Sequence, residues 1–185
     1  MSSLPAPATA PRLVLLGMRA SGKTTLGARL AAQLGVSFLD LDILTARLLG
    51  QPSAGEAIRH LGLPAFRAGE VRALQTPEAA NAGVLSLGGG TPTDEGARAI
   101  IQTFKRAGSK VVYLRAQPAA LQARLARTDL SSRPSLTGAN PIDEVEALFK
   151  ARDPIFRTVA DTVIDVDHLT ESAAQAALQT LLSTQ

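Results

Sequence analysis

The chain has 185 residues, of which 45% are hydrophobic, 19% charged and 3% aromatic, with no cysteine and a formal net charge of +3. This length favours one domain with a substantial core, and the lack of cysteine excludes disulfides and cysteine-based metal or redox centres, as expected of a cytoplasmic protein. The small positive charge favours anionic small ligands over nucleic acid, and no apolar run reaches the roughly 18 residues that a membrane span needs.

The chain begins with proline- and alanine-rich residues 1–11, which lack the basic and apolar regions of a signal peptide and are expected to form a disordered tail. A strand is predicted at residues 12–16, and a helical pattern opens at Leu26 and runs to about Leu34, before Gly35. The segment between them reads G-M-R-A-S-G-K-T-T, which matches the phosphate-binding pattern G-x-x-x-x-G-K-[ST] in its strand–helix setting.

This loop predicts a site for a nucleoside triphosphate. Glycines at positions 17 and 22 let the backbone curl, so that successive N–H groups point at the phosphates. Lys23 would lie against the β- and γ-phosphates, and the Thr24 hydroxyl would be a ligand of Mg²⁺. The alternative is a glycine-rich turn that carries Lys-Thr by chance. The residues expected to bind the nucleotide are Gly17, Ala20, Ser21, Gly22, Lys23, Thr24 and Thr25.

The rest of the chain alternates further strands with helices. Strands are predicted at residues 36–39, 84–87, 110–114 and 163–166. Helices are predicted within residues 43–75, with breaks at Gly50, Gly55 and 62–64, and at 93–105, 118–127, 143–152 (ending before Pro154) and after Thr170. Nearly all-apolar strands between helices indicate a parallel sheet covered on both faces. We therefore predict a single α/β domain over residues 12–185, a three-layer α/β/α sandwich with a five-stranded parallel sheet.

Two carboxylates follow the second predicted strand, at the edge where ligands bind such a sheet. Beside a triphosphate, Asp40 and Asp42 suit two tasks. One can contact Mg²⁺, directly or through water, and the other can orient an acceptor hydroxyl or take its proton. The alternative is that Asp42 only caps the following helix.

Glycines and arginines supply the other candidate site residues. Gly88, Gly89 and Gly90 end the third predicted strand and permit close approach of a ligand, although a flexible connector is the alternative. Ser86 either holds a metal-bound water or is a core serine. A guanidinium binds a carboxylate or phosphate through two parallel hydrogen bonds, yet many arginines are only surface charges. The arginines that stand out by context are Arg67, Arg127, Arg133 and Arg152.

Together these motifs resemble those of the shikimate kinase family, over nearly the whole chain from about Arg12. The matching segments are G-M-R-A-S-G-K-T-T, D-L-D, F-R-A-G-E, L-S-L-G-G-G, R-T-D-L-S-S-R-P-S-L and A-R-D-P-I-F. Phe156 stands where the family commonly has tyrosine. The resemblance implies a P-loop NTPase fold of the nucleoside-monophosphate-kinase type, with acceptor-binding helices at about 43–75 and a mobile lid at about 128–140.

The resemblance also implies transfer of the γ-phosphoryl group of ATP to the 3-hydroxyl of shikimate, in chorismate and aromatic amino-acid biosynthesis. Asp42 would hold the ring hydroxyls as candidate base, with Asp40 on the Mg²⁺ side. The residues implied to bind the acceptor are Asp42, Arg67, Gly88, Gly89, Gly90 and Arg152. Arg127 and Arg133 would lie on the nucleotide, and Lys23, Asp42 and Arg133 would be catalytic.

We expect a monomer that binds ATP and shikimate, with no nucleic-acid or membrane partner. One alternative is another small-molecule P-loop kinase, similar to gluconate kinase, because two arginines imply a carboxylate without identifying the acid. The other is a catalytically silent, ligand-sensing domain on the same fold. Such a domain would be expected to lose Lys23, Asp42 or Arg133, all of which this chain retains.

Overall fold

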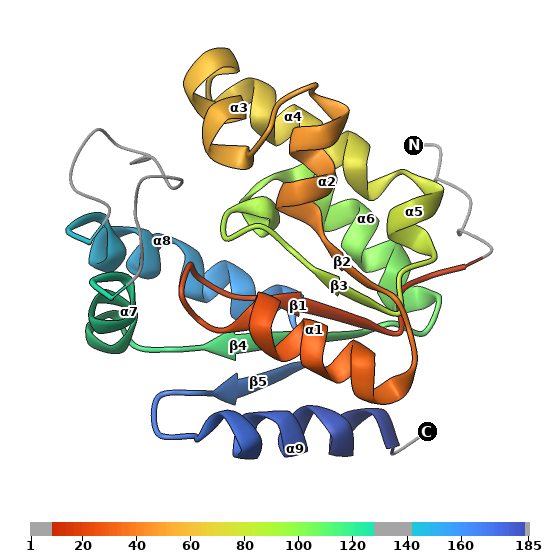
Figure 1. Cartoon of the computed structure of the whole chain (residues 1–185), viewed down its shortest axis with the longest axis vertical. Helices are drawn as coiled ribbons and strands as arrows, with labels where there is room; N and C mark the ends of the chain where they lie inside the picture. Colours follow the sequence, from red (N-terminus) through yellow and green to blue (C-terminus); the bar gives the residue numbers. More distant parts are fainter. Residues whose placement is uncertain (1–8, 128–141, 184–185) are drawn as a thin grey trace.

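The structure, a computed structural model, describes residues 9–127 and 142–183 (Figure 1). Residues 1–8 of the expected tail lie outside this range, as do the whole expected lid at 128–140 and Arg133. Pro11 is buried, and its carbonyl accepts a hydrogen bond from the Ser109 hydroxyl. The chain therefore packs against the domain one residue before the expected start at Arg12.

Five parallel strands form one sheet in the order β2-β3-β1-β4-β5 (Figure 1). They are β1 (Leu13–Leu16), β2 (Phe38–Asp40), β3 (Val84–Ser86), β4 (Lys110–Arg115) and β5 (Thr162–Asp165). All four residues of the central strand β1 have no exposed surface, because helices cover both faces of the sheet. The predicted five-stranded parallel α/β sheet is confirmed.

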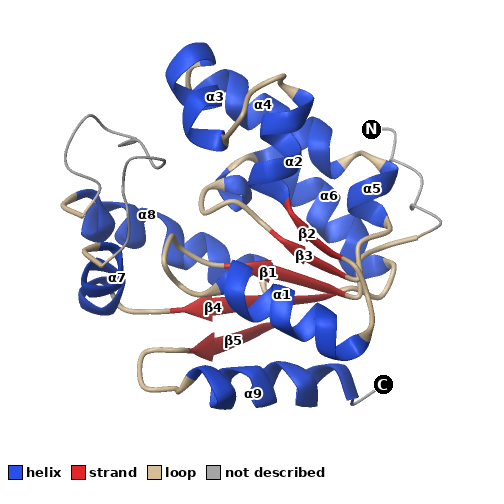
Figure 2. Ribbon diagram, viewed as in Figure 1, coloured by secondary structure: helices blue, strands red, loops and turns tan. Residues whose placement is uncertain are grey.

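Helices pack on the sheet and on one another (Figure 2). Helix α1 (Lys23–Leu34) contacts α9 (Glu171–Ser183). Helix α8 (Glu144–Val159) contacts both α6 (Glu95–Arg106) and α7 (Pro118–Leu125). Gly35 ends α1 with a φ of 64°, as its position predicted. Among the helices of residues 9–127 and 142–183, none has the length and apolar character to cross a membrane.

A helical layer follows β2 and lies beyond it at the top of Figure 1. It comprises α2 (Leu41–Leu48), α3 (Ala54–Leu61) and α4 (Leu63–Leu74), and the short α5 (Pro77–Ala80) follows. The break predicted at Gly55 is wrong, since Gly55 is buried inside α3. Ser53 caps that helix by accepting a hydrogen bond from the Glu56 N–H, at 3.1 Å. The Ser53 cap starts the helix one residue before Gly55, which lies in the first turn and does not break the helix.

The predicted end of a helix before Pro154 is also wrong. Helix α8 runs through Pro154 to Val159. Proline removes one helical hydrogen bond, but Phe156 on the next turn is fully buried and holds the helix against β4. Packing of that turn therefore overrides the local break signal.

Candidate active site

The glycine-rich loop between β1 and α1 curls around its own lysine. The Lys23 ammonium donates hydrogen bonds to the Gly17 and Met18 carbonyls, at 2.9 and 3.1 Å. A side chain at position 17 would begin 2.6 Å from the Leu114 carbonyl oxygen, so only glycine fits there. Gly22 precedes α1 with a φ of 94°, a left-handed conformation that glycine adopts without strain. The strand–loop–helix setting predicted for phosphate binding is present.

The loop opens onto a cleft of about 540 Å³ at the carboxyl ends of the strands. A parallel sheet of this kind binds ligands at that edge. The loop, the ends of β2 and β3, and helices α3, α4, α7 and α8 contribute to its walls. The polar and glycine residues of its lining include Arg19, Lys23, Thr24, Asp40, Asp42, Ser86, Arg67, Gly89, Gly90, Arg124 and Arg152.

The two carboxylates after β2 take different positions. Asp40 accepts a hydrogen bond from the Thr24 hydroxyl at 2.9 Å, and from the Asp42 N–H at 3.0 Å. Asp40 is thus the cap of α2, and the alternative in which Asp42 caps this helix is wrong. The Asp42 side chain, in the first turn of that helix, is left to line the cleft.

Asp42 lies in an environment that favours its protonated form. Burial raises the pKa of its carboxyl from 3.8 to about 6, with help from the negative charges of Glu70 and Asp40. The positive charges of Lys23 and Arg67 lower the pKa by less. A carboxylate with a pKa near 6 can accept a proton at neutral pH more readily than an ordinary aspartate.

The glycine run after β3 is a packing surface for charged side chains. A Cβ atom on Gly88 would overlap both the Asp42 Oδ1 and Glu70 Oε1 atoms. A Cβ atom on Gly90 would overlap the Arg67 guanidinium. Gly88 and Gly90 are buried, so this part of the run does not behave as a flexible connector.

Two arginines from different helices converge on these glycines. Arg67 pairs with Glu70, which also accepts a hydrogen bond from the Thr91 hydroxyl. Arg152 is buried and donates a hydrogen bond to the Gly89 carbonyl at 2.8 Å. Burial lowers the pKa of Arg152 to about 10, and the nearby charges of Arg67 and Arg19 contribute to the decrease. An anionic ligand beside these guanidinium groups would relieve their mutual repulsion.

The described chain also resembles known proteins. The family model for shikimate kinase matches residues 19–182. The chain belongs to the shikimate kinase family. It is 41% identical to the shikimate kinase of Oleidesulfovibrio alaskensis over 155 residues, which cover 83% of this chain and 87% of the relative. The shikimate kinase of Saccharopolyspora erythraea is 41% identical over 158 residues, 85% of each chain.

A solved structure agrees with this assignment. Shikimate kinase from Acinetobacter baumannii, solved in complex with shikimate, is 32% identical, with a TM-score of 0.81 over 96% of each chain. The family resemblance found in the motifs is thereby confirmed, as is the P-loop fold that it implied.

Four of the predicted site residues in the described chain do not line the cleft: Gly17, Ser21 and Gly88 are buried, and Arg127 is exposed. Arg127 is exposed after the end of α7 and does not line the cleft, so its contact with the nucleotide stays a prediction. Arg124, about one turn earlier, does line the cleft and donates hydrogen bonds to the Ala20 and Val166 carbonyls, at 3.4 and 2.9 Å. Neither Arg124 nor Arg19 was identified from the sequence. The position of Arg19 inside the phosphate loop was the available signal.

Oxygen atoms suited to Mg²⁺ meet where β2 and β3 end beside the loop. The Thr24 hydroxyl and Asp40 carboxylate are in contact, and Ser86 is the register partner of Asp40 on β3. The Ser86 Oγ atom is buried, with no hydrogen-bond partner among the described residues. In residues 9–127 and 142–183, no three aspartate, glutamate, histidine or cysteine side chains are arranged so that they could hold a metal ion by themselves. This donor set fits a hard cation that takes most of its ligands from phosphate and water.

Proposed function

We propose that the chain transfers the γ-phosphoryl group of ATP to the 3-hydroxyl of shikimate, giving 3-phosphoshikimate and ADP. The observation that carries this proposal is one cleft that joins the Lys23 phosphate loop to an acceptor side built from Asp42, Arg67 and Arg152. An acid with several hydroxyl groups matches that acceptor side, since two guanidinium groups suit its carboxylate and a carboxylate suits a hydroxyl.

The donor side of the proposed site holds the triphosphate. Backbone N–H groups of residues 17–25 and the Lys23 ammonium neutralise the phosphate charge that develops during transfer. We propose that Thr24 and Asp40 hold Mg²⁺, with Ser86 contacting a water in its shell. When bound, Mg²⁺ would supply positive charge that stabilises the transferring phosphoryl group. The role proposed for Arg127 is to contact the nucleotide, and that proposed for Arg133 is to act from a lid that excludes water. Both roles rest on the sequence motifs.

The acceptor side positions the attacking oxygen. In this proposal Arg67 and Arg152 bind the shikimate carboxylate. Gly88 to Gly90 lie on the acceptor side, where Gly88 and Gly90 leave room for the side chains of Asp42 and Arg67. The 3-hydroxyl oxygen forms a bond to the γ-phosphorus while the bond to the bridging oxygen of ADP breaks, and Asp42 accepts the hydroxyl proton. The pKa of Asp42, near 6, supports this role at neutral pH. Catalysis then depends mainly on positioning and charge neutralisation.

A coupled assay of ADP formation tests the proposal. Purified protein is given MgATP with shikimate, quinate, gluconate or no acceptor, and each reaction is repeated with excess chelator. We expect rapid ADP formation with shikimate alone, and its loss on chelation. Preference for gluconate would identify the gluconate-kinase-like alternative. ATP or shikimate binding without ADP formation would identify the ligand-sensing alternative, and either result contradicts the proposal.

A further inference from the structure

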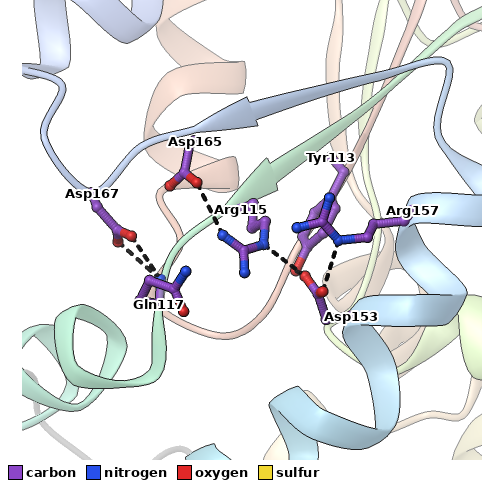
Figure 3. Close-up of polar contacts among 7 residues, drawn as sticks. All are labelled: Tyr113, Arg115, Gln117, Asp153, Arg157, Asp165 and Asp167. Carbon is purple, nitrogen blue, oxygen red and sulfur yellow. Dashed lines mark hydrogen bonds and ion pairs between the residues drawn. The ribbon is translucent and has the colours of Figure 1, made fainter.

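A polar network beside the cleft joins helix α8 to the sheet (Figure 3). Its centre is the Asp153 carboxylate, which accepts hydrogen bonds from the Tyr113 hydroxyl at 3.0 Å and from the Nε atoms of Arg115 and Arg157, both at 2.8 Å. Arg115 also donates to the Asp165 carboxylate at 3.0 Å. One aspartate on α8 is therefore tied to β4, and through Arg115 to β5.

Apolar contacts lie on the same face of the helix. The rings of Tyr113 and Phe156 meet edge to face, with centroids 5.2 Å apart. The Arg115 guanidinium carbon lies 5.1 Å from the centre of the Phe149 ring. Phe149, Asp153 and Phe156 are spaced by four and three residues, which places them on one side of an α-helix. This face fixes how α8 is rotated about its own axis.

That rotation sets the direction of the neighbouring residue, Arg152. The Arg152 guanidinium is buried on the cleft side and donates to the Gly89 carbonyl, whereas Asp153 is held on the sheet side. A group about 6 Å from a helix axis moves by about 1 Å when the helix rotates by about 10°. A displacement of about 1 Å can reduce catalysis about a hundredfold.

Pro154 makes this turn of α8 dependent on an external anchor. Proline has no N–H, so it cannot donate to the Lys150 carbonyl, and the helix is weakened beside Arg152. Burial opposes ionisation of Asp153, but hydrogen bonds from Arg157, Arg115 and Tyr113 outweigh it and hold the pKa below the usual value. Asp153 therefore stays charged and paired at the weakened turn.

We propose that Asp153 is a positioning residue for shikimate binding, which acts by orienting Arg152 toward the acceptor carboxylate. This inference rests on the proposed function, in which Arg152 binds that carboxylate. Asp153 itself does not line the cleft and touches no substrate in this account. Its removal should weaken acceptor binding and leave ATP binding unchanged, because the phosphate loop and Lys23 belong to other elements.

The test compares Asp153→Asn with the matched variant Asp161→Asn in the full chain. Asp161 also anchors the chain to β4, by accepting from the Val111 N–H at 2.8 Å, and it pairs with Lys105 at 2.8 Å, away from the cleft. We expect Asp153→Asn to raise the KM for shikimate about tenfold with the KM for ATP unchanged. Asp161→Asn should lower the melting temperature without altering either KM. Equal effects on both KM values, or no effect of Asp153→Asn, would overturn the inference.

Two further variants separate positioning from general destabilisation. The single variant Arg152→Lys and the double variant that carries both Arg152→Lys and Asp153→Asn should have nearly the same KM for shikimate, because Asp153 acts through Arg152. Additive effects of the two substitutions on this KM would overturn the inference. If Asp153→Asn does not fold, Tyr113→Phe removes only one hydrogen bond to Asp153, and an unchanged KM for shikimate would then overturn it. If the parent chain forms no ADP with shikimate, the proposed function itself fails; if it does and only these variants disagree, the positioning role alone fails.

Discussion

Replacing Asp42 with asparagine should abolish turnover and at the same time stabilise the protein. Asparagine keeps the size of the side chain but cannot accept the hydroxyl proton. A positioned general base contributes about 10² to 10⁴ in rate, so we expect kcat to fall by about that factor. The Kd for ATP should change little, because the role proposed for Asp42 is on the acceptor and not on the nucleotide.

The expected gain in stability follows from the pKa of Asp42. A rise from 3.8 to about 6 means that the folded state disfavours the charged carboxylate by about 3 kcal/mol once it is ionised. Since the folded pKa is raised, the contribution of Asp42 to stability is fully present below pH 3.8 and is lost as the pH rises through about 6. The neutral asparagine side chain of the variant would avoid that loss.

Urea unfolding of both proteins at pH 4.5 and pH 8 measures this effect. The stability of Asp42→Asn relative to the parent should increase by about 2 kcal/mol between the two pH values. Comparing the two proteins at each pH cancels the titration of groups that do not interact with Asp42. An equal stability difference at both pH values, or a kcat within about threefold of the parent, would refute the reasoning about burial and proton transfer.

Three other substitutions test the remaining parts of the site. Arg67→Ala should raise the KM for shikimate by about 10- to 100-fold and the KM for ATP by much less. The control variant Arg72→Ala, at an exposed position on the same helix, should alter neither KM. Equal effects of Arg67→Ala on both KM values would argue against a carboxylate contact. Gly90→Ala places a Cβ atom in the space of the Arg67 guanidinium, so kcat/KM for shikimate should fall at least about tenfold, and an unchanged value would contradict the close packing. Asp40→Ala should raise the Mg²⁺ concentration for half-maximal rate about tenfold and lower stability by about 1 kcal/mol, while Asp94→Ala, which removes the cap of α6, should lower stability only.

Patterns close together in the sequence predicted the fold and the donor side of the cleft. Gly17, Gly22, Lys23 and Thr24 stand between an apolar strand and a helix, and that local order is enough to define a phosphate loop. The strands were recognisable because helices cover both faces of the sheet, which requires nearly continuous apolar runs. Asp40 and Asp42 were predicted to work beside the loop, and they line the same cleft.

Features that depend on contacts between distant residues could not be predicted. Helix α8 continues through Pro154 because Phe156 packs on Tyr113, more than forty positions away in the chain. Glu70 is buried because Arg67 and Thr91 both bind it, and only the first of these partners is a neighbour in sequence. Local propensity therefore failed where tertiary packing decided the outcome.

Phosphorus NMR of a reaction containing the protein, MgATP and shikimate tests the central claim most directly. We expect one new phosphomonoester signal, coupled to the proton on carbon 3 of shikimate, to grow as the γ-phosphate signal of ATP disappears. Formation of inorganic phosphate alone, or of an ester at another hydroxyl, would contradict the account of an acceptor oriented by Asp42, Arg67 and Arg152.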